Sequence, residues 1–245
     1  MIPKIIHLCW LSGDPYPRKI QDCLDSWKKH LPSYEIILWD TKRFNIHEVP
    51  WVEQAFNTKK YAFAADYIRL YALYHHGGIY LDSDVEILKS LDNFLELPYF
   101  VGAETSGTIE AAILGAEKGC DWIKYEGRNF IREDGSYDIR MLPEILNETI
   151  LRLKPVINMP SGSNIDDLKK KDLGEAVYVL PKEYFSPKVF DSREVFLTPE
   201  THAIHHYQNS WFSHKAFAYY RTRTLFIKIF GYKAVRSLEK MLLKR

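Results

Sequence analysis

Hydrophobic and polar residues follow a regular order along the first third of the chain. Three short apolar runs predict β-strands, at residues 2–10, 34–39 and 79–81. Three segments with apolar residues every three or four positions predict helices, at residues 18–30, 47–56 and 59–76. Gly77-Gly78 ends the last helix in the manner of a helix C-cap. This β-α-β-α-β order with short connections predicts an α/β fold with a mainly parallel central sheet covered by helices.

The rest of the chain predicts strands and helices in a less regular order. The expected strands are residues 99–103, 109–114, 177–180 and 203–207, and the expected helices are 122–131 and 140–153. Residues 161–171 form the most loop-like stretch. We expect one domain over residues 1–214 and a helical extension over residues 215–245, in which Gly231 separates two helical pieces.

Charge is distributed unevenly between these two parts. Residues 215–245 contain nine Lys and Arg against one Glu, a net charge of +8, so the remaining residues carry −7. The extension is also rich in apolar residues, and a basic amphipathic helix can lie in the headgroup region of an anionic membrane. The alternative is a terminal helix docked on the core with its charged face in water. Nucleic acid is disfavoured as a partner because the body is acidic.

Several classes of protein are excluded by composition. No apolar run is long enough for a transmembrane helix, and Pro3, Lys4 and His7 interrupt any signal-peptide pattern at the N-terminus. Three cysteines without a CxxC pair suit neither a disulfide scaffold nor a structural zinc site. We therefore expect a cytoplasmic protein.

The clearest chemical motif is the Asp82-Ser83-Asp84 triplet after the third strand. Side chains alternate along an extended chain, so we expect both carboxylates to project to one side and Ser83 to the other. Paired carboxylates suit Mg²⁺ or Mn²⁺, which take oxygen ligands and leave positions for phosphate oxygens. Trp10 and Asp40 end the first two strands, and ligands of parallel sheets bind at such ends.

Two further segments carry candidate site residues. Asp66 and Arg69 lie three residues apart on a helix face that also carries small and apolar residues. A buried Asp and Arg need partners, and Arg can hold phosphate in a forked geometry; the alternative is a surface ion pair. Residues 205–211 (HHYQNSW) follow a short strand and offer a histidine as third metal ligand. The alternative is a histidine with a structural role.

The segments IPKIIHLCW, AFAADYIR, GGIYLDSDV and HHYQNSW together resemble glycosyltransferase family 32, the enzymes with a DxD sugar-binding region. The core motifs are also similar to those of the family 44 toxin glucosyltransferases. The resemblance covers residues 1–96 and 202–211. It implies a GT-A (Rossmann-like) catalytic domain, a nucleotide-sugar donor, Mn²⁺ or Mg²⁺, and retention of anomeric configuration.

The resemblance also assigns roles to individual residues. The expected catalytic residues are Asp66, Arg69 and Asp82, which would hold the donor sugar, its phosphates and the ribose. Around the nucleotide, Trp10 would stack on the base, Tyr80 would line the pocket and Trp211 would close over the diphosphate. The expected metal ligands are Asp82, Asp84, His205 or His206, and Asn209 or Ser210, with His206 closer to the toxin pattern.

The implied function is transfer of a hexose or N-acetylhexosamine to a glycan or lipid-linked acceptor in surface polysaccharide, capsular or lipooligosaccharide synthesis. A UDP-sugar is favoured as donor over GDP-mannose, and the enzyme would be peripheral on the cytoplasmic face of a membrane. One alternative is a haloacid-dehalogenase-type phosphatase, although Glu86 stands where that class needs a Thr. The other is a sugar-binding scaffold without turnover.

Overall fold

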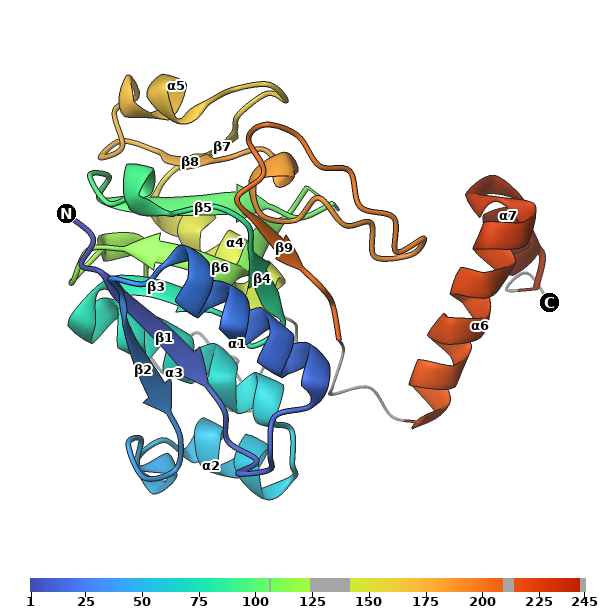
Figure 1. Ribbon diagram of the computed structural model, residues 1–245, viewed down its shortest axis with the longest axis horizontal. Helices are drawn as coiled ribbons and strands as arrows, with labels where there is room; N and C mark the ends of the chain where they lie inside the picture. The colour runs from blue at the N-terminus through green and yellow to red at the C-terminus, as the bar shows by residue number, and fades with distance from the viewer. Residues whose placement is uncertain (106, 124–141, 209–213, 243–245) are drawn as a thin grey trace.

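The computed structural model describes residues 1–105, 107–123, 142–208 and 214–242. Its centre is a five-stranded sheet in the order β2-β1-β3-β6-β5 (Figure 1). The strands are β1 (Ile5–Cys9), β2 (Glu35–Trp39), β3 (Gly78–Leu81), β5 (Tyr99–Ala103) and β6 (Ile109–Ala116). β1 pairs in parallel with β2 and β3, and β6 runs antiparallel to β3 and β5. Four strands therefore share one direction, which confirms the mainly parallel α/β sheet.

Helices cover both faces of this sheet. In Figure 1, α1 (Arg18–His30) lies in front of the sheet and α3 (Tyr61–His76) lies behind it, while α2 (Pro50–Asn57) leads into α3. α1 packs with Ile6 and Leu8 of β1 in one hydrophobic cluster, whereas α3 packs with Cys9 of the same strand in another. The two clusters follow from strand geometry, because successive side chains point to opposite faces.

The glycine pair between α3 and β3 is required by the close approach of other backbone segments. Gly77 and Gly78 have φ values of +67° and +110°, which side chains rarely adopt. A Cβ atom on Gly77 would lie 2.7 Å from the Lys118 nitrogen, and one on Gly78 would lie 2.7 Å from the Ile5 oxygen. The pair therefore allows α3 to turn directly into β3 beside β1.

Two small sheets lie beside the central one. β4 (Val85–Ile87) pairs antiparallel with β9 (Ala203–His205), and β7 (Val156–Asn158) pairs in parallel with β8 (Val177–Val179). Neither β4 nor β7 was expected from the hydrophobic pattern, whereas β8 and β9, which are as short, lie within the strands predicted over 177–180 and 203–207.

Helices in the second half agree only partly with expectation. α4 (Leu142–Leu153) confirms the described part of the helix predicted over 140–153. The helix predicted over 122–131 falls outside the described residues from position 124 onward. The loop predicted over 161–171 is wrong, because it contains α5 (Ile165–Lys169). A capping box between Asn164 and Asp167 stabilises this single turn, which buries only Leu168.

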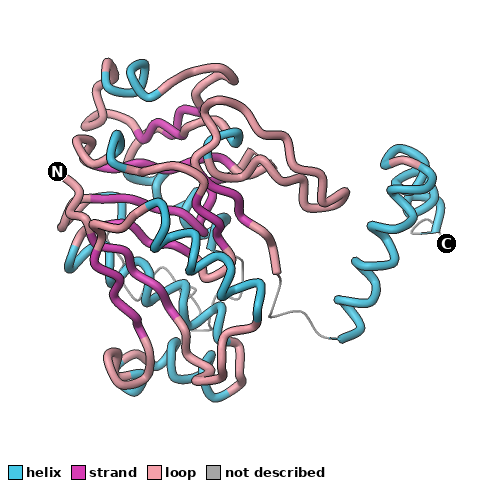
Figure 2. Tube along the Cα trace, in the orientation of Figure 1, coloured by secondary structure: helices cyan, strands magenta, loops and turns pink. Residues whose placement is uncertain are grey.

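The C-terminal helices α6 (His214–Phe230) and α7 (Tyr232–Leu242) form a hairpin beside the body (Figures 1 and 2). Gly231 has a φ of +81° and lies between them, which confirms the predicted break into two helical pieces. Among the described helices, none combines the length and apolarity needed to cross a bilayer. The division into a domain over 1–214 and an extension stays a prediction.

Candidate metal and donor site

The two aspartates of the DxD triplet lie in a tight turn between β3 and β4. The Val85 N–H donates to the Asp82 carbonyl oxygen at 3.0 Å, which closes the turn. The expectation that Asp82 and Asp84 line up along an extended strand is therefore wrong; the turn brings them together instead. β4 then pairs with β9 so that Val85 lies opposite His205.

Asp82, Asp84 and His205 form a cluster suited to a divalent cation. One ligand atom from each residue lies within 4.8 Å of the others, and the His205 Nε2 is 3.6 Å from the Asp84 Oδ1. Two carboxylate oxygens and one imidazole nitrogen match the preferences of Mn²⁺ or Mg²⁺. The Gln208 N–H donates to the other Asp84 oxygen at 2.7 Å and fixes that carboxylate. The residues present therefore fit the metal that the sequence implied.

The structure distinguishes the two neighbouring histidines. His206 points away from the aspartates, with its Nε2 2.8 Å from the Glu86 carboxylate and its Nδ1 3.2 Å from the Lys188 Nζ. The geometry thus groups His205 with the DxD carboxylates, whereas the toxin pattern favoured His206. Asn209, Ser210 and Trp211 lie outside the described residues, and their roles stay predictions.

Glu110 contacts His205 on the side away from the aspartates, a role that the sequence did not assign to it. Its side chain is 1% exposed, and its Oε2 lies 3.2 Å from the His205 Nδ1 and accepts from the Ser186 hydroxyl. The other oxygen accepts from the Ala112 N–H at 2.8 Å. The available signal was a single acidic residue in the otherwise apolar run 109–116.

The pKa values of this pair reflect mutual stabilisation. Burial opposes a charged imidazole, but the carboxylates of Glu110 and Asp84 outweigh it and raise the pKa of His205 to about 10. Burial likewise opposes a charged Glu110, but His205 holds the pKa of that carboxyl below its usual value. A carboxylate on Nδ1 leaves Nε2 facing the aspartates, which is the orientation that a metal-binding histidine needs.

Glu110→Gln should weaken Mn²⁺ binding roughly 10- to 100-fold, because metal-binding histidines depend on the carboxylate that orients them. Calorimetric titration of the purified chain with Mn²⁺ measures the effect. Glu35→Gln, at an exposed position on β2, is the matched control and should leave the affinity unchanged. Equal Mn²⁺ affinity in Glu110→Gln and the wild-type chain would show that Glu110 does not orient His205.

A second ion network adjoins the metal cluster. The Arg69 Nη2 lies 2.9 Å from the Asp66 Oδ1 and 3.2 Å from the Asp82 Oδ1, while its Nη1 donates to the Ala111 carbonyl at 2.6 Å. The guanidinium lies 4.5 Å from the centre of the Tyr80 ring, and the Tyr80 hydroxyl donates to Asp82 at 2.8 Å. The buried Asp66–Arg69 face predicted from the sequence is confirmed.

This network holds Asp82 in place from the protein side. Arg69 and Tyr80 are 5% and 1% exposed, so their contacts are mostly to protein groups. Burial lowers the pKa of Arg69, but Asp82, Tyr80 and Asp66 together raise it above its usual value. Burial raises the pKa of Asp66 to about 7 against the opposing effect of Arg69. The expected contacts of Asp66, Arg69, Tyr80 and Asp82 with a donor stay predictions.

Trp10 lies at the carboxyl end of β1, as expected. Its side chain is half-buried, its Nε1–H donates to the Asp14 carbonyl at 2.8 Å, and its ring lies 4.9 Å from that of Tyr16. The partly open aromatic pair suits stacking on a planar ligand, and the predicted contact of Trp10 with a nucleobase stays a prediction.

Two cations that the sequence reasoning missed lie on the loop beside His206. The Lys188 Nζ donates to the His206 carbonyl at 3.1 Å, and the Arg193 Nη1 donates to the Tyr207 carbonyl at 3.0 Å. In the described part of the chain, neither forms an ion pair with a carboxylate. Burial and the charge of Arg193 lower the pKa of Lys188. Arg193 and Tyr207 have φ values of +61° and +53°, a strained backbone of the kind that clusters at functional sites.

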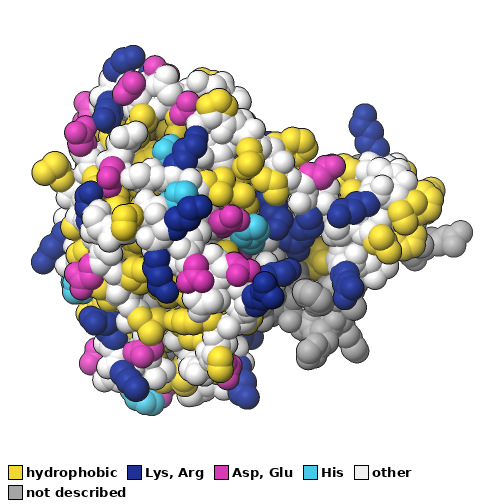
Figure 3. All heavy atoms as spheres, in the orientation of Figure 1, with side chains coloured by type: hydrophobic (Ala, Val, Ile, Leu, Met, Phe, Trp, Pro, Cys, Tyr) yellow, Lys and Arg dark blue, Asp and Glu magenta, His cyan; other side chains and the backbone are white. Residues whose placement is uncertain are grey.

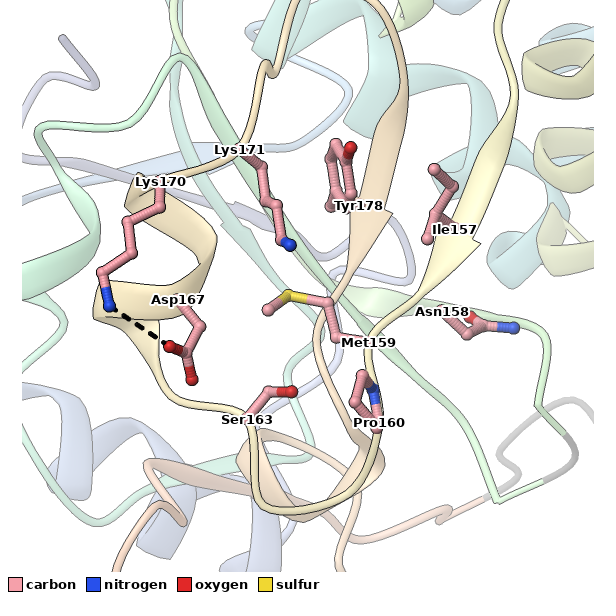
Figure 4. A pocket seen from close by; sticks show the side chains of 9 residues that line it. All are labelled: Ile157, Asn158, Met159, Pro160, Ser163, Asp167, Lys170, Lys171 and Tyr178. Carbon is pink, nitrogen blue, oxygen red and sulfur yellow. Dashed lines mark hydrogen bonds and ion pairs between the residues drawn. The ribbon is translucent and has the colours of Figure 1, made fainter.

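A separate pocket of about 260 Å³ lies between the β7–β8 pair and α5 (Figure 4). Inside it, Lys170 is 3.5 Å from the Asp167 carboxylate and Lys171 lies over the Tyr178 ring. None of its lining residues belongs to the metal cluster. The candidate site is therefore the partly buried cluster around the DxD turn, and this pocket is not part of it.

Residues 17–101 match the family described as the glycosyltransferase sugar-binding region containing a DXD motif. The matched region begins just before α1 and includes α3 and the Asp82–Asp84 turn. Over this region the chain is similar to the DXD glycosyltransferases. Its mixed α/β sheet is the architecture that the resemblance implied for such an enzyme.

Curated relatives of this chain include inositol phosphoceramide mannosyltransferase 3 of Schizosaccharomyces pombe, 33% identical over 135 residues. That match covers 54% of this chain and 38% of the relative. An uncharacterized glycosyltransferase of Acanthamoeba polyphaga mimivirus is 35% identical over 109 residues, covering 42% of this chain and 43% of the relative. The chain thus spans less than half the length of both. Among solved structures, PaToxG glycosyltransferase aligns with a TM-score of 0.49 and 20% identity over 62% of this chain and 68% of that one.

Proposed function

We propose that this chain is a glycosyltransferase that moves a hexosyl group from a nucleotide sugar to a glycan or lipid-linked acceptor in a reaction that depends on a divalent cation. The observation that carries the proposal is the Asp82–Asp84–His205 cluster, which brings three ligand atoms together inside the DXD region. The family match favours a transferase over the phosphatase considered above. Mn²⁺ is the cation we would test first.

We propose GDP-mannose as a donor to be tested equally with the UDP-sugar that the sequence favoured. Curated relatives are named as mannosyltransferases, which is the support for mannose. Their names also mention inositol phosphoceramide, so a lipid-linked acceptor is the first class to test. Use of a surface polysaccharide or lipooligosaccharide acceptor remains our alternative proposal.

When bound, the cation would supply positive charge to the diphosphate that leaves the donor. Asp82, Asp84 and His205 would hold it, and Glu110 would orient His205. Lys188 and Arg193 add fixed positive charge on the same edge, where phosphate oxygens would develop charge during transfer. Charge stabilisation of the leaving group is therefore the main contribution that we propose for these residues.

We assign no nucleophilic side chain. In the proposed front-face reaction, the acceptor hydroxyl oxygen bonds to the anomeric carbon as the bond to the diphosphate breaks. The hydroxyl proton passes to the departing phosphate oxygen. Both events occur on one face of the sugar, so the anomeric configuration is retained and an α-linked donor gives an α-linkage.

Cellular location is a further part of the proposal. All three cysteines are free and buried, as a reducing compartment allows. We therefore propose a cytoplasmic catalytic domain.

The deciding experiment is a thermal-shift panel of UDP- and GDP-sugars with and without Mn²⁺. A donor at 100 times its Kd should raise the melting temperature by about 5–10 °C, the equivalent of roughly 2.7 kcal/mol. We expect one nucleotide class to stabilise the chain, and only with Mn²⁺. The stabilising donor is then incubated with acceptors, and NMR of the product should show an α-linkage.

Each contrary outcome removes a different part of the proposal. No stabilisation by any nucleotide sugar, in a chain that is folded by circular dichroism, would contradict the donor site. Stabilisation without turnover on any glycan or lipid-linked acceptor would favour the non-catalytic scaffold. A β-linked product from an α-linked donor would contradict retention.

A further inference from the structure

The two C-terminal helices α6 and α7 pack against each other through buried apolar side chains and an ion pair. Ile227 and Val235 are 5% and 7% exposed, and the Gly231 N–H donates to the Ile227 carbonyl at 2.8 Å to end α6. The Arg223 Nε lies 2.6 Å from the Glu239 carboxylate and joins the two helices. The contacts that join α6 to α7 therefore do not use the side chains on the outer surface of the hairpin.

The outer surface of the hairpin is apolar and in water. On α6, Leu225 and Ile229 lie one turn apart, as do Phe226 and Phe230, whose rings stack at 5.8 Å. These four side chains are between 47% and 63% exposed. α7 adds Met241, which is 61% exposed. Single exposed apolar side chains are common on protein surfaces, but a contiguous group of large ones marks an interaction surface.

Basic side chains border this apolar surface. Arg221, Lys228, Lys233 and Arg236 are all exposed. Glu239 is the one acid in the sequence of residues 215–245, and its carboxylate is paired with Arg223. Figure 3 shows dark blue and yellow side chains together over this end of the molecule. The surface is thus apolar at its centre and positive around it.

We propose that the outer surface of the α6–α7 hairpin docks on an anionic lipid surface. Apolar side chains would enter the headgroup boundary while the bordering Lys and Arg bind lipid phosphates. The charge decides between occupants, because two copies of a surface this positive repel each other. An anionic lipid leaflet offers an apolar interior for the central side chains and negative headgroups for the bordering Lys and Arg.

The hairpin is fastened to the loop that carries the two cations of the candidate site. Arg223 binds the Asp191 carboxylate, and the Thr224 hydroxyl donates to the Asp191 carbonyl at 2.9 Å. Asp191 lies between Lys188 and Arg193 in the sequence. A lipid-bound hairpin would therefore hold this edge of the site near the membrane, although the docking itself does not depend on the proposed transfer activity.

Co-sedimentation of the full chain with vesicles tests the proposal without any donor or acceptor. We expect binding to vesicles of phosphatidylcholine with phosphatidylglycerol, release at high salt, and no binding to phosphatidylcholine alone. Lys228→Gln/Lys233→Gln should weaken binding about 25-fold, from the contribution of each basic side chain near a charged bilayer. Ile229→Ser/Phe230→Ser should weaken it at least about tenfold.

Matched variants and a solution measurement keep the test decisive. Leu151→Ser, 55% exposed on α4, and Lys29→Gln/Lys42→Gln, both exposed on the body, should bind as the wild-type chain does. Circular dichroism checks that every variant is folded. Absence of binding to both vesicle types overturns the proposal, and so does equal binding to both. A dimer seen by light scattering and lost in Ile229→Ser, without vesicle binding, would assign the surface to a second copy of the chain.

Discussion

Asp84→Asn is expected to lower transfer activity roughly 10²- to 10³-fold. It removes a carboxylate that would hold the divalent cation, and that cation would stabilise the leaving diphosphate. Asp84 is 9% exposed and one oxygen accepts the Gln208 N–H at 2.7 Å. The Asn side-chain oxygen can accept the same hydrogen bond, so the turn should stay intact. The amide lacks the negative charge that a divalent cation prefers.

The effect of Asp84→Asn is measured by initial rates across a range of Mn²⁺ concentrations and by direct Mn²⁺ titration. Asp166→Asn, at an exposed position of α5, is the matched control and should keep full activity. We expect both Mn²⁺ affinity and rate to fall in Asp84→Asn alone. Full activity in the folded Asp84→Asn variant would show that the cluster does not hold a catalytic metal.

Arg69→Met is expected to lower the free energy of unfolding by about 3–5 kcal/mol, the typical cost of removing one partner from a buried ion network. The change would leave the Asp66 and Asp82 carboxylates without their shared cation and the Ala111 carbonyl without its donor. Met fills most of the Arg69 volume, so lost packing contributes little. Urea denaturation followed by circular dichroism gives the difference in stability.

A second substitution separates charge from packing in this network. Arg69→Met/Asp66→Asn should recover part of the lost stability, because one buried carboxylate charge is removed with its partner. Arg152→Met breaks an exposed pair with Glu148 and should change stability by less than about 1 kcal/mol. If Arg69→Met does not fold, Arg69→Lys retains one charge and should fall between the two. Wild-type stability in Arg69→Met would contradict the role assigned to the network.

Local patterns were sufficient for the first third of the fold. The helix predicted over residues 18–30 is α1, Arg18–His30, since its apolar spacing and the following Pro32 define both ends. The buried face of α3 was also evident, because Asp66 and Arg69 share it with small and apolar residues. Such features depend on neighbours within a few positions, which sequence periodicity records directly.

The arrangement of the metal cluster depends on contacts that no local pattern records. His205 meets Asp84 through the pairing of β9 with β4, more than a hundred positions apart in the sequence. Spacing alone could not choose between His205 and His206, because either histidine could face the aspartates until the register of that pairing is known. The role of Glu110 could not be predicted locally either, since it depends on the contact of its carboxylate with His205.

The sequence by itself determined the α/β class, the DxD motif, the buried Asp66–Arg69 pair and the basic C-terminal segment. Tertiary structure decided that a turn brings Asp82 and Asp84 together, that His205 joins them, and that Lys188 and Arg193 border the same edge. It also decided that the apolar side of α6 faces water. The physical reason is the range of the interactions: periodicity and capping act within one element, whereas a site is assembled by strand pairing and packing between elements distant in the chain.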